Sequence, residues 1–291
     1  MTDRDRETIG LHAQLACIWE ATARKPGNVH RFVDFDDLSY LDFLTCAAAV
    51  APVLAAAPDH RVGHTVLEGV RRTRQVVRTN SNLGILLLVA PLAKAAAEPD
   101  LRTGLVRVLD DLDVEDSRLV YEAIRLANPG GLGQVSKQDI KDEPTLSLRA
   151  VMVLAADRDL IARQYANGFR EVFDDGVPAV LEGMERTGSL EGAIIYTHLC
   201  LMARHPDTLI ARKRGAVEAM ESAMRARAVL DKGWPHKPKG RDAFADLDAW
   251  LRAEGRRRNP GTTADMIAAC LFVLLRERKI VLPLQCPWSR A

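Results

Sequence analysis

The sequence has few aromatic residues, almost no net charge and no paired cysteine motif. Aromatics make up 5% of the 291 residues and the formal net charge is +1, so no global field favours nucleic acid or a membrane surface as a partner. The five cysteines are odd in number, scattered, and never form a CxxC motif. We interpret them as reduced core thiols of a cytoplasmic protein.

Long apolar runs are also missing. The charged stretch MTDRDRETIG lacks the apolar region of a signal peptide. The longest apolar run, residues 83–93, is too short to span a bilayer and contains Pro91. It therefore predicts a buried helix, and no membrane partner is expected.

What remains is a chain rich in alanine and leucine, with 47% hydrophobic residues. Strand-like alternation is nearly absent, and the apolar positions recur at helical spacing. We expect one all-α globular domain over residues 1–291, built from ten or more helices, with residues 82–97 as an apolar central helix. The predicted helices cover residues 8–24, 38–57, 61–78, 82–97, 114–127, two within 145–168, and 170–186, 190–204, 208–230, 243–254 and 262–277.

Five polar clusters stand out, each at the end of a predicted helix. They are ARKPGNVHRFVDFDD (23–37), RTNSNLG (78–84), NPGGLG (128–133), HPDTLIARKRG (205–215) and RRRNPGTTAD (256–265). Helix ends from one face of a helical bundle can share a cleft. Free N–H groups at a helix N-terminus favour bound phosphate, so the clusters indicate a possible anion site.

Each cluster also has a purely structural interpretation. Asp36 or Asp37 would be the N-cap of helix 38–57, and Asp207 would cap the helix that follows it. Thr262 and Asp265 resemble a capping box. Asn128 before glycines is typical of a helix C-terminus.

Taken together, the clusters resemble a known family. E-x-T-x-x-KPGNVHR (20–31), TNSNLG, ARHPDTLIARKRG and NPGTTADMIAACLF follow the order found in triphosphoribosyl-dephospho-CoA synthases. The resemblance implies an all-α transferase that uses ATP and Mg²⁺. In this reaction a hydroxyl of dephospho-CoA, or of another phosphorylated acceptor, attacks C1′ of the ATP ribose and adenine leaves.

The resemblance also implies residue roles. Triphosphate requires cations and Mg²⁺, the attacking hydroxyl requires a base, and the ribosyl centre gains positive charge. The matching cations are Lys25, Arg31, Arg212 and Arg214. The candidates for catalysis are Asp36, Asp37 and Asp207, and those for the metal are Asp34, Asp36, Asp37, Asp207 and Asp265. The remaining candidates for binding substrate or phosphate are Glu20, Gly27, Asn28, His30, Thr79, Asn80, Asn82, Gly84, Thr208, Asn259, Gly261 and Thr262.

Two alternatives stay open. The loop TNSNLG has no lysine where the family carries one after its Thr-Asn pair. This difference favours a divergent member that assembles another cofactor, for example a tetrahydromethanopterin-type one-carbon carrier. A non-catalytic helical protein that binds a ligand is the third hypothesis, and a homodimer is possible in each case.

Overall fold

The computed structural model describes residues 2–79, 81–130 and 137–289, and within these it contains α-helices and short helical turns but no strand. The α-helices are α1 (Asp3–Thr22), α2 (Tyr40–Ala55), α3 (Val62–Val76), α4 (Leu83–Ala95), α5 (Leu101–Asp110), α6 (Val114–Ala127), α7 (Leu148–Val153), α8 (Leu160–Asn167), α9 (Val177–Thr187), α10 (Leu190–Arg204), α11 (Thr208–Arg214), α12 (Ala216–Asp231), α13 (Pro238–Arg252) and α14 (Gly261–Arg276). A 3₁₀ turn, η1 (Ala57–Asp59), follows α2, and a π-helical turn, η2 (Glu171–Gly176), precedes α9. The all-α prediction is confirmed.

Most predicted helices are present, and the differences have local causes. Helix 208–230 is two helices, because Gly215 has φ 92° and separates α11 from α12. The sequence prediction missed α5, whose first turn is capped by the Asp100 side chain, which accepts from Thr103 N at 2.7 Å. The break predicted within 145–168 is confirmed, since α7 and α8 are separate.

Two of the four predicted caps differ in the structure. Ser39, and neither Asp36 nor Asp37, caps α2, in a reciprocal capping box with Asp42. Thr262 and Asp265 form no capping box, because α14 begins after Pro260 without a side-chain cap. Asp207 does cap α11, and Asn128 ends α6 in the left-handed conformation as predicted.

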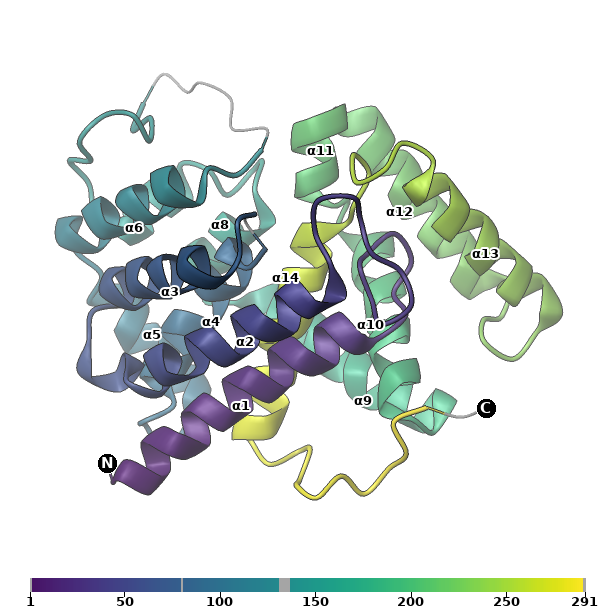
Figure 1. Cartoon of the computed structure of the whole chain (residues 1–291), viewed down its shortest axis with the longest axis horizontal. Helices are drawn as coiled ribbons and strands as arrows, with labels where there is room; N and C mark the ends of the chain where they lie inside the picture. The colour runs from purple at the N-terminus through teal and green to yellow at the C-terminus, as the bar shows by residue number, and fades with distance from the viewer. Residues whose placement is uncertain (1, 80, 131–136, 290–291) are drawn as a thin grey trace.

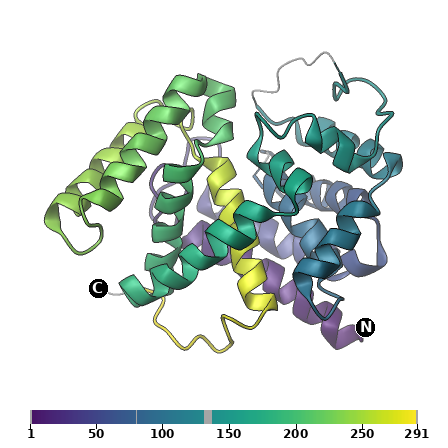
Figure 2. The same cartoon turned by 180° about the vertical axis from the view of Figure 1, so that it is seen from behind.

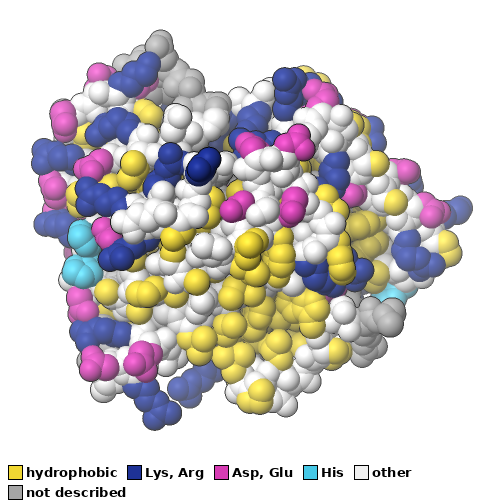
Figure 3. All heavy atoms as spheres, viewed as in Figure 1, with side chains coloured by type: hydrophobic (Ala, Val, Ile, Leu, Met, Phe, Trp, Pro, Cys, Tyr) yellow, Lys and Arg dark blue, Asp and Glu magenta, His cyan; other side chains and the backbone are white. Residues whose placement is uncertain are grey.

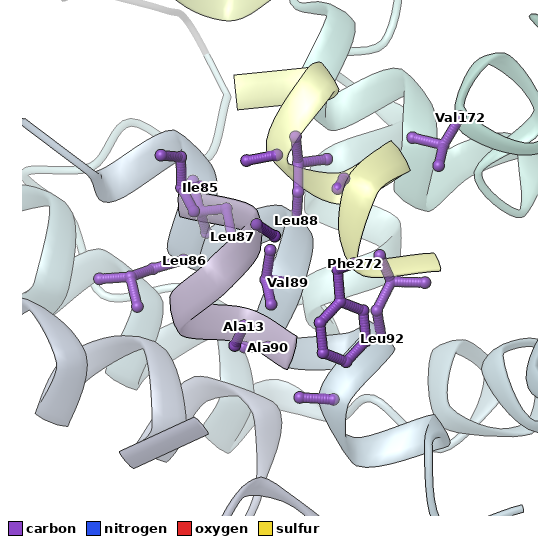
Figure 4. Close-up of a cluster of buried hydrophobic side chains, with 14 of the residues drawn as sticks. Ala13, Ile85, Leu86, Leu87, Leu88, Val89, Ala90, Leu92, Val172 and Phe272 are labelled. Atoms are coloured by element: carbon purple, nitrogen blue, oxygen red, sulfur yellow. The ribbon is translucent and has the colours of Figure 1, made fainter. Parts of the chain in front are cut away.

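Helices α4 and α14 form the centre of the main hydrophobic core. Figure 4 shows Leu88, Val89 and Leu92 of α4 beside Phe272 of α14, with Ala13 of α1 nearby. Almost every side chain of α4 is buried, as expected for a helix that is apolar on all sides. In the described part of the chain, no helix combines the length and apolar character needed to cross a membrane.

The remaining helices lie on two sides of this centre. Figure 1 shows α3, α5 and α6 on one side and α11, α12 and α13 on the other, and Figure 2 shows the same arrangement from behind. Helices α10 to α13 share a second, smaller apolar cluster that includes Leu199, Ile210 and Leu247. The cavity described below lies where the two sides face each other.

Candidate functional site

One large cavity, of about 810 Å³, lies between the two sides of the molecule. In the space-filling view a hollow opens between the two upper lobes, with lysine and arginine side chains beside it (Figure 3). All five polar clusters contribute to its lining. The contributing residues from these clusters and from α1 include Glu20, Asn28, Thr79, Asn82, Gly84, Asn128, Gly130, Arg212, Asn259, Gly261, Thr262 and Asp265.

Two carboxylates from different helices face the cavity close to each other. Glu20 comes from the last turn of α1 and Asp265 from the first turns of α14. Burial raises the pKa of the Asp265 carboxyl well above its ordinary range, and the negative charge of Glu20 adds to the effect. Among the described residues, nothing donates a hydrogen bond to Asp265 or pairs with it.

Gly84 makes room for the Asp265 carboxylate. It is the second residue of α4, and a Cβ there would overlap Oδ2 of Asp265. The carboxylate thus lies against the N-terminal turn of α4, where the helix dipole is positive. The third element of this contact is Ile161 of α8, whose Cδ1 would be 2.9 Å from the same Cβ.

The KPGN turn places Lys25 inside the protein and Asn28 at the cavity. Lys25 is 0% exposed, and its ammonium lies 2.9 Å from Oε1 of Glu20. It also donates to the backbone carbonyl oxygens of Glu20 and, at 3.4 Å, of Ala23. Gly27 permits the turn, with φ 75° and its N–H donated to Asp248 Oδ1 at 2.7 Å. Lys25 therefore does not reach the cavity.

Four of the cations that line the cavity come from α11 and the segment before α14, namely Arg212, Lys213, Arg256 and Arg257, and Lys137 and Arg158 come from other segments. Arg212 Nη1 lies 3.3 Å from Asp159 Oδ2, and Lys213 Nζ lies 3.5 Å from the carbonyl oxygen of Arg256. Burial lowers the pKa of Lys213, and the neighbouring Arg256 and Arg212 lower it further. Lys213 lies beside two like charges, so an anion that binds here would neutralise the positive charges of Lys213, Arg212 and Arg256 together.

Other predicted cations are occupied elsewhere. Arg31 pairs with Glu191 at 2.6 Å, at the start of α10, and also donates to the carbonyl oxygen of Thr22. Arg214 pairs with Glu218 at 2.7 Å on the outer side of α11. Neither lines the cavity. His30 is buried outside it too, and burial, with nearby Arg252 and Lys25, lowers its pKa to about 4.

The three aspartates of the 34–37 segment also lie outside the cavity lining. Asp34 accepts a hydrogen bond from Tyr40 N at 2.6 Å, and Asp36 is exposed. Asp37 pairs with Arg256 at 2.7 Å, while its carbonyl oxygen accepts from Thr79. These contacts hold the segment against the cavity rim. Asn80 lies outside the described residues.

Asp207 is fully buried and joins α11 to α14. Its Oδ1 accepts from the N–H groups of Leu209 and Ile210 at 2.9 and 3.1 Å. Its Oδ2 accepts from the N–H and hydroxyl of Thr263, both at 2.8 Å. With four donors already in place, Asp207 has the geometry of a structural cap. Thr208, next to it, donates to Thr262 at 3.2 Å.

Replacing Asp207 with alanine should destabilise the fold by about 3 kcal/mol, because the change leaves buried donors unpaired and removes the cap of α11. Urea unfolding followed by circular dichroism would measure the loss. Asp246→Ala, at an exposed position on α13, is the control. An Asp207→Ala protein as stable as the wild type would contradict this interpretation.

Asparagine side chains complete the polar wall. Asn28 donates to Asn259 Oδ1 at 2.6 Å, and both residues line the cavity. Oδ1 of Asn28 is buried and has no hydrogen-bond partner among the described residues, so a ligand hydroxyl or amino group could donate to it. Asn82 is held by Thr73, its Nδ2 lying 2.9 Å from the threonine hydroxyl.

Sequence reasoning missed several residues of the lining. Lys213 lies between two arginines that were chosen as phosphate ligands, and Arg256 belongs to a quoted cluster without an assigned role. Successive residues of a helix point about 100° apart. Helix geometry alone therefore indicates that the side chains of residues 212–214 cannot all face the same cavity. No sequence motif indicated that Asp159, or the apolar side chains of α6 and α7, would line the cavity. These apolar side chains include Val120, Ile124, Val151 and Met152.

Comparisons with known proteins give a consistent result. A family model described as ATP:dephospho-CoA triphosphoribosyl transferase matches residues 6–282. A protein of Pseudomonas savastanoi pv. phaseolicola, named probable 2-(5''-triphosphoribosyl)-3'-dephosphocoenzyme-A synthase, is 33% identical over 135 residues, covering 43% of this chain and 45% of that protein. A protein of the same name from Pseudomonas syringae pv. tomato is 30% identical over 154 residues, covering 47% and 52%.

A solved structure is similar over a longer range. The crystal structure from Archaeoglobus fulgidus that is provisionally named triphosphoribosyl-dephospho-CoA synthase superposes with a TM-score of 0.63 and 25% identity. The superposition covers 80% of this chain and 98% of that one. The chain spans about half the length of the curated relatives it matches, whereas the family model and the solved structure extend over most of it.

Proposed function

The chain belongs to the ATP:dephospho-CoA triphosphoribosyl transferase family, and from this premise we propose that it transfers the triphosphoribosyl group of ATP to dephospho-CoA. The observation that carries the proposal is the cavity whose lining contains both the cations of α11 and the 256–257 segment and the carboxylates Glu20 and Asp265. The cations suit a triphosphate. The carboxylates suit a ribosyl centre that gains positive charge.

The proposed reaction exchanges one bond at C1′ of the ribose. A hydroxyl oxygen of dephospho-CoA forms the new bond to C1′ and loses its proton, while the bond from C1′ to adenine breaks and adenine takes up a proton. The triphosphate stays on the ribose, so no P–O bond breaks. The cavity has apolar walls from α6 and α7, which suit the adenine ring, and polar walls, which suit phosphate.

Mg²⁺ fits the donor set of this cavity. Mg²⁺ bound with a triphosphate usually takes one or two protein carboxylates, with phosphate oxygens and water as the other ligands. In the described part of the chain no group of three acidic, histidine or cysteine side chains could hold a metal alone. Asp265 lines the cavity and has no partner among the residues that the structure describes, so it would be the carboxylate that meets a phosphate-bound Mg²⁺. The ion would neutralise triphosphate charge.

The test is incubation of the purified protein with ATP, Mg²⁺ and dephospho-CoA, followed by chromatography for free adenine. We expect adenine and a coupled nucleotide product in equal amounts. No adenine above a control without enzyme would reject the proposed reaction. Binding of another phosphorylated acceptor with no response to dephospho-CoA would instead favour the divergent cofactor enzyme that the missing loop lysine suggested. The homodimer and the cytoplasmic location stay predictions.

We call Arg212, Lys213 and Arg256 the phosphate clamp. Removal of one of its charges should weaken ATP binding more than it lowers turnover. Lys213→Met keeps the length of the side chain but removes its charge from the group formed with Arg212 and Arg256. We expect the KM for ATP to rise about tenfold with a smaller change in kcat, since one phosphate contact is lost in the ground state and in the transition state alike. Lys239→Met, at an exposed position on α13, is the control. An unchanged KM would remove Lys213 from the clamp.

A further inference from the structure

Lys25 belongs to the motif that most resembles the family, yet its side chain points away from the cavity. It is 0% exposed, and its three N–H donors have three acceptors, namely a carboxylate oxygen of Glu20 and the carbonyl oxygens of Glu20 and Ala23. These carbonyls end α1, where a cation is favoured by the helix dipole. Its donors are therefore all used within the protein.

Glu20 depends on Lys25 for its charge balance. The carboxylate is 3% exposed, and burial raises its pKa while the Lys25 ammonium opposes that rise. Two histidines also lie near Lys25, and burial lowers the pKa of both: His198, which is fully buried, and His30. Asp265, the remaining neighbour of Glu20 in the cavity, is a like charge. Lys25 is thus the counter-ion that lies 2.9 Å from the Glu20 carboxylate at the cavity wall and opposes the cost of burying that acid.

We propose that Lys25 is a positioning residue that fixes the Glu20 carboxylate at the cavity wall, and that Glu20 stabilises the positive charge developing on the ribosyl centre. This inference rests on the proposed function. It differs from the phosphate contact that the motif suggested, because Lys25 acts through another side chain and touches no substrate. Two neighbouring carboxylates in different surroundings can serve different purposes, and the paired one suits a fixed negative charge.

The experiment compares Lys25→Met, Glu20→Gln and the double variant. The single Lys25 change leaves a buried acid without its counter-ion and should lower the melting temperature, while the double change removes both charges and should restore it. We expect kcat for adenine release to fall at least thirtyfold in each variant, the stable double variant included. The double variant should be no worse than Glu20→Gln, since both changes act on one carboxylate.

Binding of ATP to the same proteins, measured by calorimetry, separates the two roles of Lys25. A positioning residue leaves the Kd for ATP within about threefold, whereas a phosphate ligand would raise it tenfold or more on its removal. Weaker ATP binding by Lys25→Met, or recovery of activity together with stability in the double variant, would overturn the inference. If the wild type releases no adenine, the proposed function fails. Unchanged ATP binding by Lys25→Met would then still support the positional assignment, and weakened binding would overturn it.

Discussion

Asp265→Asn is expected to lower adenine release by about a hundredfold or more while the fold is retained. Asparagine has nearly the same shape, so the change removes charge and little else. In the described part of the chain the wild-type carboxylate has no partner. It faces the cavity against the start of α4, where we propose that it meets phosphate-bound Mg²⁺. Loss of one well-placed charged group in an enclosed site typically costs two to three orders of magnitude in rate.

The control for this variant is Asp246→Asn on the exposed side of α13, which should release adenine at the wild-type rate. Assays over a range of Mg²⁺ concentrations add a second measure, because a metal-binding carboxylate shifts the Mg²⁺ requirement upwards when it is removed. Wild-type activity in Asp265→Asn would show that the chemistry does not use this carboxylate.

The same variant should be more stable than the wild type, and increasingly so as the pH rises. The folded-state pKa of Asp265 lies well above its ordinary value because the group is buried beside Glu20, whereas the unfolded carboxyl titrates near about 3.9. Between these two values the folded protein binds more protons than the unfolded one, so wild-type stability falls as pH rises through the window.

Asparagine does not titrate, and Asp265→Asn therefore escapes this loss. Melting temperatures of both proteins at several pH values between 5 and 8, without nucleotide or Mg²⁺, would measure the difference. A gap that stays constant across this range would contradict the raised pKa. A carboxylate that costs stability and is needed for turnover is expected at a functional site rather than in a purely structural role.

Asp207 and Asp265 show how far the sequence could predict the site. Both aspartates stand near a helix start in a matched motif, and both were candidates for the metal. Their difference lies in the donors around them. Asp207 accepts from N–H and hydroxyl groups at the starts of α11 and α14, and no described residue donates to Asp265. Hydrogen-bond satisfaction depends on how α11, α14 and α4 pack, which no local pattern contains.

The fold could be predicted from the sequence more completely than the site, because helical periodicity is a local property. The apolar run 83–93 became α4 within the core, and Gly215 shows what periodicity cannot detect, since a single left-handed residue divides a continuous pattern. Side-chain direction was the main source of difference at the site. Lys25 turns inward at a positive-φ glycine, and Arg214 points to Glu218 while Lys213 lines the cavity.

Gly84→Ala should lower adenine release by about a hundredfold because it displaces the Asp265 carboxylate without removing its charge. The new methyl group would overlap Oδ2 of Asp265, so the carboxylate must move away from the start of α4. A displacement of about 1 Å can cost about a hundredfold when groups must meet in one geometry. Alanine favours a helix over glycine by about 1 kcal/mol, which should offset part of the crowding, and calorimetry should find a fold of similar stability.

Two comparisons make this result specific. Gly104→Ala on α5 also brings a methyl group against a side chain, that of Glu98, but away from the cavity, and it should leave adenine release unchanged. In an Asp265→Asn background, Gly84→Ala should cause almost no further loss, because both changes act on the same carboxylate. Independent, multiplying losses would instead mean that Gly84 is required for another reason, such as close approach of the substrate to the N-terminal turn of α4.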